Sequence, residues 1–154
     1  MRNECYTYFR ITGRFDPDEI TDLLGLKPDQ CWKIGDLRKN GTAYDFANWS
    51  FGRCDEYDGH VGEQMRKTIA PLREKIDVLD GIRRAYDATY FLEIVPVVYA
   101  GEESPCLAPP MDIIDFCHVT RTEIDIDLYV MAAEYEENCS VGGCAPRRAG
   151  SFNN

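Results

Sequence analysis

Two tryptophans and an aspartate lie close together in the sequence and could form a ligand site. Trp32 begins a Trp-Lys-Ile-Gly-Asp segment that ends at Asp36, and Trp49 follows it in the next strand-like segment. An indole ring can stack on a ligand or anchor a protein partner. The same rings can instead pack a hairpin against the core, with Gly35 and Asp36 forming a turn. If the chain has a ligand pocket, we expect it here.

A second set of candidate residues alternates along the first and the last strand-like segments. Alternate positions face the same side of a sheet. In the first segment, one side carries Tyr6, Tyr8 and Arg10. In the last segment, one side carries Glu123, Asp125, Asp127 and Tyr129. If the two strands are neighbours, Arg10 could pair with an aspartate across the sheet. Such a face suits protein recognition, although an ordinary solvated face would have the same composition.

Evidence for metal binding is weak. Cys139 and Cys144 are separated by four residues, and Cys117-His118 could complete a set of ligands. A structural zinc site normally takes its four ligands from paired clusters, and only one loose pair is present. We therefore predict no metal ion, and interpret the pair as idle thiols or a disulfide.

Evidence for catalysis is also weak. His60 follows the acidic segment 55–59 and could transfer protons, but a polar loop before a helix explains it equally. The sequence contains no GxSxG, P-loop, HExxH or GxGxxG motif. We predict no catalytic residues and no cofactor.

The charge of the chain narrows the classes of partner. Its net charge is −10, and residues 88–135 contain nine acidic side chains and a single basic one, Arg121. Nucleic acids and anionic membranes are bound by basic surfaces, so neither is an expected partner. A basic protein is the partner that this charge favours.

No segment predicts secretion or membrane insertion. The longest apolar run, Ile94 to Ala100, contains a proline and is far shorter than the roughly 18 residues of a spanning helix. The first ten residues have no apolar core and no cleavage site. We therefore expect a cytoplasmic protein whose seven cysteines are reduced and mostly buried.

Hydrophobic periodicity predicts alternating strands and helices. Strands are expected at 5–13, 31–36, 44–53, 88–99 and 122–130, and helices at 17–24, 61–70, 71–86 and 111–117. Pro96 lacks a donor for the sheet and predicts an edge or a bulge in its strand. The pattern ends near Glu136, so we expect one domain over 1–135 and a flexible tail containing glycine and cysteine over 136–154.

This order of elements predicts an α+β fold. Four or five strands, mainly antiparallel, would form a sheet with helices on one face, in a two-layer sandwich related to the ferredoxin-like fold.

Three consecutive blocks of the sequence, 8–13, 15–21 and 24–28, resemble the opening of a bacterial family known as domain of unknown function 4279. The segments 32–36 and 123–129 and the residue Trp49 are similar to that family as well. The resemblance covers residues 5–130 and implies one compact bacterial domain. It implies no activity, because the family has no established catalytic residues.

Two functional hypotheses follow. The first is a non-enzymatic interaction protein whose acidic strand face binds a basic protein, for example a toxin that it neutralises in the manner of an immunity protein. The alternative is a small-molecule binder or enzyme whose pocket is lined by Trp32 and Trp49. The sequence leaves the oligomeric state open.

Overall fold

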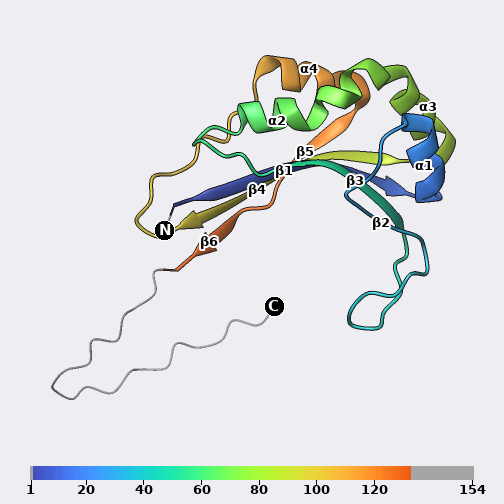
Figure 1. Ribbon diagram of the computed structural model, residues 1–154, viewed down its shortest axis with the longest axis horizontal. Coiled ribbons are helices and arrows are strands. Elements are labelled where there is room, and N and C mark those ends of the chain that lie inside the picture. Colours follow the sequence, from blue (N-terminus) through green and yellow to red (C-terminus); the bar gives the residue numbers. More distant parts are fainter. Residues whose placement is uncertain (1, 133–154) are drawn as a thin grey trace.

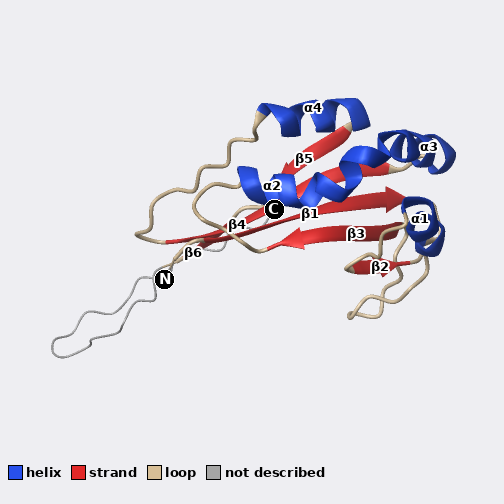
Figure 2. Ribbon diagram, turned by 45° about the horizontal axis from the view of Figure 1, so that its top comes forward, coloured by secondary structure: helices blue, strands red, loops and turns tan. Residues whose placement is uncertain are grey.

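A single six-stranded sheet is the centre of the computed structural model, which describes residues 2–132 (Figure 1). The strands are β1 (Glu4–Gly13), β2 (Gln30–Trp32), β3 (Ala47–Cys54), β4 (Thr89–Tyr99), β5 (Thr122–Ile126) and β6 (Tyr129–Met131). The helices are α1 (Pro17–Leu24), α2 (Gly62–Ile69), α3 (Ile76–Tyr86) and α4 (Met111–Thr120), with the 3-10 helix η1 (Ala70–Lys75) between α2 and α3. The helices of residues 2–132 all lie on one face of the sheet, and none of them covers the other face, called here the helix-free face (Figure 2).

The strand order confirms the predicted two-layer α+β fold. The sheet runs β2-β3-β1-β4-β5, with β6 also paired to β4. The first four strands of this path are antiparallel neighbours, whereas β5 and β6 run parallel to β4. The β-α-β-β-α-β order from β1 to β4 is the ferredoxin-like one. Helix α4 and strand β5 extend it with a further crossover.

The last predicted strand, 122–130, is divided into two in the structure, which gives six strands rather than four or five. The backbone N–H of Asp127 donates to the carbonyl of Ile94 (2.9 Å), so Ile94 faces β5. Pro96, two residues later, faces the same way but has no N–H to donate. Pairing resumes at Val97 with β6. The expectation that β4 is an edge strand is wrong, because it has neighbours on both sides.

Helix α1 begins and ends where local signals predict. The Asp16 side chain accepts a hydrogen bond from the backbone N–H of Asp18 (3.0 Å), and Pro17 occupies the first turn. Gly25 ends the helix in the left-handed conformation with φ 63°. The buried side chains Ile20 and Leu24 hold the helix against the sheet.

The long helical stretch breaks at Ala70, as Pro71 predicts. The 3-10 helix η1 follows the break, and α3 begins only at Ile76, later than the predicted start at residue 71. Apolar residues three or four positions apart in this stretch supply much of the core and form a stripe, with buried side chains at Val61, Met65, Ile69, Leu72, Leu79 and Ile82. The stripe therefore faces the sheet along its whole length.

The five cysteines among the described residues divide into two groups. Cys5, Cys54 and Cys117 are buried, as expected, whereas Cys31 and Cys106 are exposed, contrary to that expectation. Burial raises the pKa of the Cys5 and Cys117 thiols to about 11. These two side chains therefore behave as small apolar core residues rather than as nucleophiles. The tail expected over 136–154, with Cys139 and Cys144, lies outside the described residues.

Candidate functional site

The helix-free face of the sheet carries most of the residues that the alternation predicts. On β1 the side chains of Cys5, Thr7, Phe9 and Ile11 are buried under the helices. Tyr6, Tyr8 and Arg10 must therefore point to the opposite side, because successive side chains of a strand alternate. The ladder brings to the same side Phe91, Glu93 and Val95 of β4 and Glu123 and Asp125 of β5.

The expected pairing of Arg10 with an aspartate of β5 is replaced by a different ion pair. Strand β4 lies between β1 and β5, so β1 and β5 share the sheet without touching. Arg10 Nη1 instead lies 2.9 Å from Glu93 Oε1. The guanidinium also lies over the Phe91 ring, 5.1 Å from its centre. Asp125 of β5, and Asp127 just after it, are thus left exposed beside this neutralised ion pair.

Two further carboxyl groups, of Asp125 and Asp127, lie near this ion pair. Glu93 is only 3% exposed, and Asp125 lies directly beside it in the β4–β5 register. The exposed Asp127 follows two residues later and accepts a hydrogen bond from the Tyr129 hydroxyl (2.9 Å). Loss of hydration raises the pKa of Glu93, and the nearby charges of Asp125 and Asp127 raise it further against the opposing effect of Arg10. The structure therefore places Arg10, Asp125, Asp127 and Tyr129 on one continuous surface.

The raised pKa of Glu93 leads to a stability prediction. Between its ordinary value of 4.5 and the raised value, the folded protein binds more protons than the unfolded chain. The free energy of unfolding contributed by Glu93 therefore falls as pH rises through this interval. Glutamine does not titrate, so the Glu93→Gln variant does not show this loss. Its free energy of unfolding, relative to that of the wild type, should therefore increase as pH rises from about 4 to about 7.

Urea denaturation at several pH values measures this difference. Glu123→Gln is the matched control, because it removes one exposed negative charge from the adjacent strand. A difference between Glu93→Gln and wild type that stays constant over the whole range would contradict the assignment.

The other half of the surface is aromatic and basic. Tyr6 and Tyr8 stack with their ring centres 6.1 Å apart, and the Arg53 guanidinium lies 3.7 Å from the centre of the Tyr6 ring. Asp55 holds that guanidinium through its two oxygens. A recess of about 150 Å³ opens here, between the two tyrosines and Arg53 and close to Ser50. Drug-sized ligands occupy roughly 300–1,000 Å³, so the recess fits one side chain of a partner.

The expectation that Trp32 and Trp49 line one pocket is wrong. Trp49 pairs with Ile11, is 0% exposed, and donates from Nε1 to the Thr21 hydroxyl (3.1 Å). Trp32 is adjacent in register to Asn48, one residue away from Trp49, and so lies on the opposite side of the sheet. The two indoles are separated by the sheet itself.

Trp32 is the last residue of β2, and Asp36 lies in the loop that joins β2 and β3. Trp32 stacks on Tyr44 with ring centres 4.3 Å apart and donates from Nε1 to the Phe46 carbonyl. The Asp36 carboxylate accepts a hydrogen bond from the Lys33 backbone N–H (2.7 Å) and forms a turn. This turn ends β2 at Trp32, earlier than predicted, and β3 begins only at Ala47. Both residues therefore have structural partners in the loop.

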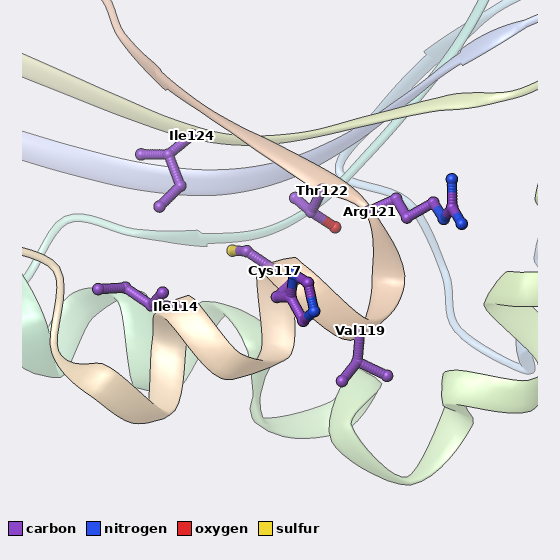
Figure 3. A pocket seen from close by; sticks show the side chains of 7 residues that line it. Ile114, Cys117, Val119, Arg121, Thr122 and Ile124 are labelled. Carbon is purple, nitrogen blue, oxygen red and sulfur yellow. The ribbon is translucent and has the colours of Figure 1, made fainter.

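A groove between α4 and β5 was not predicted. Its volume is about 900 Å³, and it is lined by Ile114, Cys117, His118, Val119, Arg121, Thr122 and Ile124. Figure 3 shows Ile114 and Cys117 on the side of the helix that faces the strand with Thr122 and Ile124, whereas Val119 points away from that strand. The sequence signal lay in the helix that borders the groove. Ile114 and Val119 are apolar residues that a core helix would be expected to bury, yet both are exposed in the structure.

His60 lies at a polar pocket of about 560 Å³ that Tyr57, Asp58 and Cys106 also line. The His60 backbone N–H donates to the Asp58 carboxylate (3.0 Å), which closes the acidic loop without orienting the imidazole. Within residues 2–132, no three His, Cys, Asp or Glu side chains come together as metal ligands. No helix of the described chain is both long enough and apolar enough to span a bilayer.

Glu93 was also missed by the sequence reasoning, although a signal was present. It is the only charged side chain in the apolar segment 88–99. A lone charge in such a run indicates a buried group that needs a partner.

Comparison with known proteins gives one result. Searches of curated proteins and of solved structures returned no match. The family model described as "Domain of unknown function (DUF4279)" matches residues 3–131, which is most of the chain and includes every strand of the sheet. The chain therefore belongs to the domain of unknown function 4279 family.

Proposed function

We propose that this protein is a non-enzymatic interaction module that binds a basic protein through the helix-free face of its sheet. The observation that carries the proposal is the exposed row of carboxylates Glu123, Asp125 and Asp127 beside the Arg10–Glu93 ion pair. A basic toxin is one partner of this chemistry, and an immunity-like function would follow from neutralising it.

The charge on this face is available to a partner. Asp112, on the helix side, is held by Arg66 and Arg73, whose guanidinium groups keep the pKa of Asp112 well below its ordinary range. By contrast, Glu123, Asp125 and Asp127 form no ion pair with a lysine or arginine of the described residues. Their field would attract a basic surface and accelerate its encounter with this face.

Aromatic groups beside the carboxylates support protein recognition. Tyr129 is half exposed next to Asp127, and Tyr6 and Tyr8 border the small recess on the same face. Tyrosine and arginine are enriched at binding hot spots, and tyrosine rings also attract cationic side chains. The face thus combines long-range attraction with groups for close contact.

The decisive experiment removes the three negative charges and measures binding of a fluorescent oligolysine peptide. The variant Glu123→Gln/Asp125→Asn/Asp127→Asn should bind about tenfold more weakly at low ionic strength, because each exposed ion pair contributes about 0.2–1 kcal/mol. The difference should shrink at about 0.15 M salt, where the Debye length is about 8 Å.

A matched control separates this face from the overall charge. The variant Asp22→Asn/Glu74→Gln/Asp77→Asn removes three exposed carboxylates from the helical layer, which gives the same net charge. It should bind the peptide nearly as well as the wild type. Equal losses in the two triple variants would mean that only net charge matters, and would refute the proposal.

A further inference from the structure

Strand β5 has a free edge. It pairs with β4 on one side, and among residues 2–132 no strand pairs with its other side. The Asp127 N–H donates to β4, and backbone groups along a strand point alternately to its two sides. The N–H and C=O groups of Ile124 and Ile126 therefore point away from the sheet. A free edge of this kind is a template for another strand.

The two faces of this edge differ sharply in chemistry. On the helix-free side lie the carboxylates of Glu123 and Asp125, with Asp127 beyond them. On the helix side lies the α4–β5 groove, with Ile114 41% exposed and Cys117 at its base (Figure 3). An added strand would therefore meet acids with one set of side chains and apolar groups with the other.

This pattern argues against a second copy of the chain as the occupant. If two β5 strands paired antiparallel about Ile124, Glu123 of each copy would face Asp125 of the other. Like charges directly opposite each other destabilise a strand pair. The acids therefore discourage self-association at an edge that is otherwise open.

We propose that an extended segment of the basic partner adds to β5 as a further strand, with lysine or arginine alternating with aliphatic residues. This inference rests on the proposed function and names its binding mode. The aliphatic side chains enter the α4–β5 groove, the basic ones face Glu123, Asp125 and Asp127, and backbone hydrogen bonds to Ile124 and Ile126 provide affinity. Strand addition of this kind combines backbone pairing with side-chain pockets at alternate positions.

Peptide binding tests the inference. A short peptide of alternating lysine and valine should bind the full-length protein at least about tenfold more tightly than an isomer with its lysines and valines in separate blocks. Backbone N–H groups of an added strand alternate between β5 and solvent. Methylating the N–H groups of either the valines or the lysines should therefore abolish binding, while methylating the other set should leave it.

A substitution in the groove gives an independent readout. Ile114→Asn should weaken the alternating peptide several-fold without affecting the blocked isomer, because it makes the wall of the groove that faces β5 polar. Ile34→Asn, at a similarly exposed apolar side chain in the β2–β3 loop, is the matched control and should leave both peptides unchanged.

The outcomes separate this inference from the proposed function. If both isomers bind equally and both weaken when the three carboxylates are neutralised, strand addition is refuted and the acidic interaction face stands. If neither peptide responds to neutralisation of the carboxylates, the proposed function fails and strand addition to a basic segment fails with it.

Discussion

Replacing Trp49 by alanine should lower the free energy of unfolding by about 3–5 kcal/mol, the range typical of large-to-small substitutions of buried aromatic residues. The ring is fully buried on the helix side of β3 and stacks on Phe51 with ring centres 5.5 Å apart. Its Nε1 also supplies a hydrogen bond to Thr21 of α1. The substitution would leave a cavity between β3 and α1 and would remove one of the two hydrogen bonds of the Thr21 hydroxyl, which also donates to the Pro17 carbonyl (3.0 Å).

Trp32 provides the matched control, because it is the same side chain one strand away. Its ring is only partly buried, against Tyr44 and Phe46 of the loop. Trp32→Ala should therefore cost about 1–2 kcal/mol, in proportion to the smaller apolar area that it buries. Chemical denaturation monitored by far-ultraviolet circular dichroism measures both losses.

Trp49→Phe keeps the measurement possible if the alanine variant does not fold. Phenylalanine retains stacking on Phe51 but lacks the indole N–H, so its loss should fall between the other two. Equal losses for Trp32→Ala and Trp49→Ala would contradict the assignment of Trp49 to the core and Trp32 to the opposite side.

The tryptophans also show what sequence reasoning could and could not reach. That both belong to a β-hairpin followed from local signals, because turn residues separate two strand-like segments. Which face each ring occupies depends on the pairing register of β2 with β3, in which Trp32 is opposite Asn48. A shift of one residue would exchange the faces, and no local pattern in so short a strand as β2 determines that register.

Local chemistry predicted the elements whose limits are set by their own residues. Helix α1 begins at the Asp16-Pro17 cap and ends at Gly25, and the helical stretch breaks before Pro71. The division of 122–130 could not be predicted in the same way. The cause is Pro96 of β4, about 30 residues earlier in the sequence. Its effect can be recognised only when β4 is known to be the strand that pairs with β5 and β6.

The carboxylates of the acidic face were predicted from the sequence, but the Arg10–Glu93 ion pair beside them was not. Strict alternation placed Asp125 and Asp127 opposite to the aliphatic side chains, and the structure leaves both exposed. The partner of Arg10 depends on strand order, and β4 rather than β5 is adjacent to β1. The α4–β5 groove likewise arises from the crossover between β4 and β5, a property of the topology.

The close packing of α2 on β3 leads to the second large prediction, which concerns Gly52. Gly52 has a φ of 74°, and a Cβ atom placed on it would lie 2.9 Å from the carbonyl oxygen of Thr68 in α2. Its own carbonyl accepts a hydrogen bond from the Thr68 hydroxyl (2.8 Å), which also contacts the Thr7 hydroxyl at 2.8 Å. A side chain at this position would push the helix away from the sheet and separate these buried groups.

Gly52→Ala should therefore lower the free energy of unfolding by about 2–4 kcal/mol. The left-handed backbone accounts for about 1–2 kcal/mol, and the remainder comes from the displaced helix and the disturbed buried hydrogen bonds, which are each worth about 1 kcal/mol. Gly41→Ala isolates the backbone contribution, since Gly41 has a φ of 82° and nothing within 4 Å of its Cβ position. Urea titrations of the two variants should differ by more than about 1 kcal/mol, and equal losses would mean that α2 does not approach β3 as closely as the structure has it.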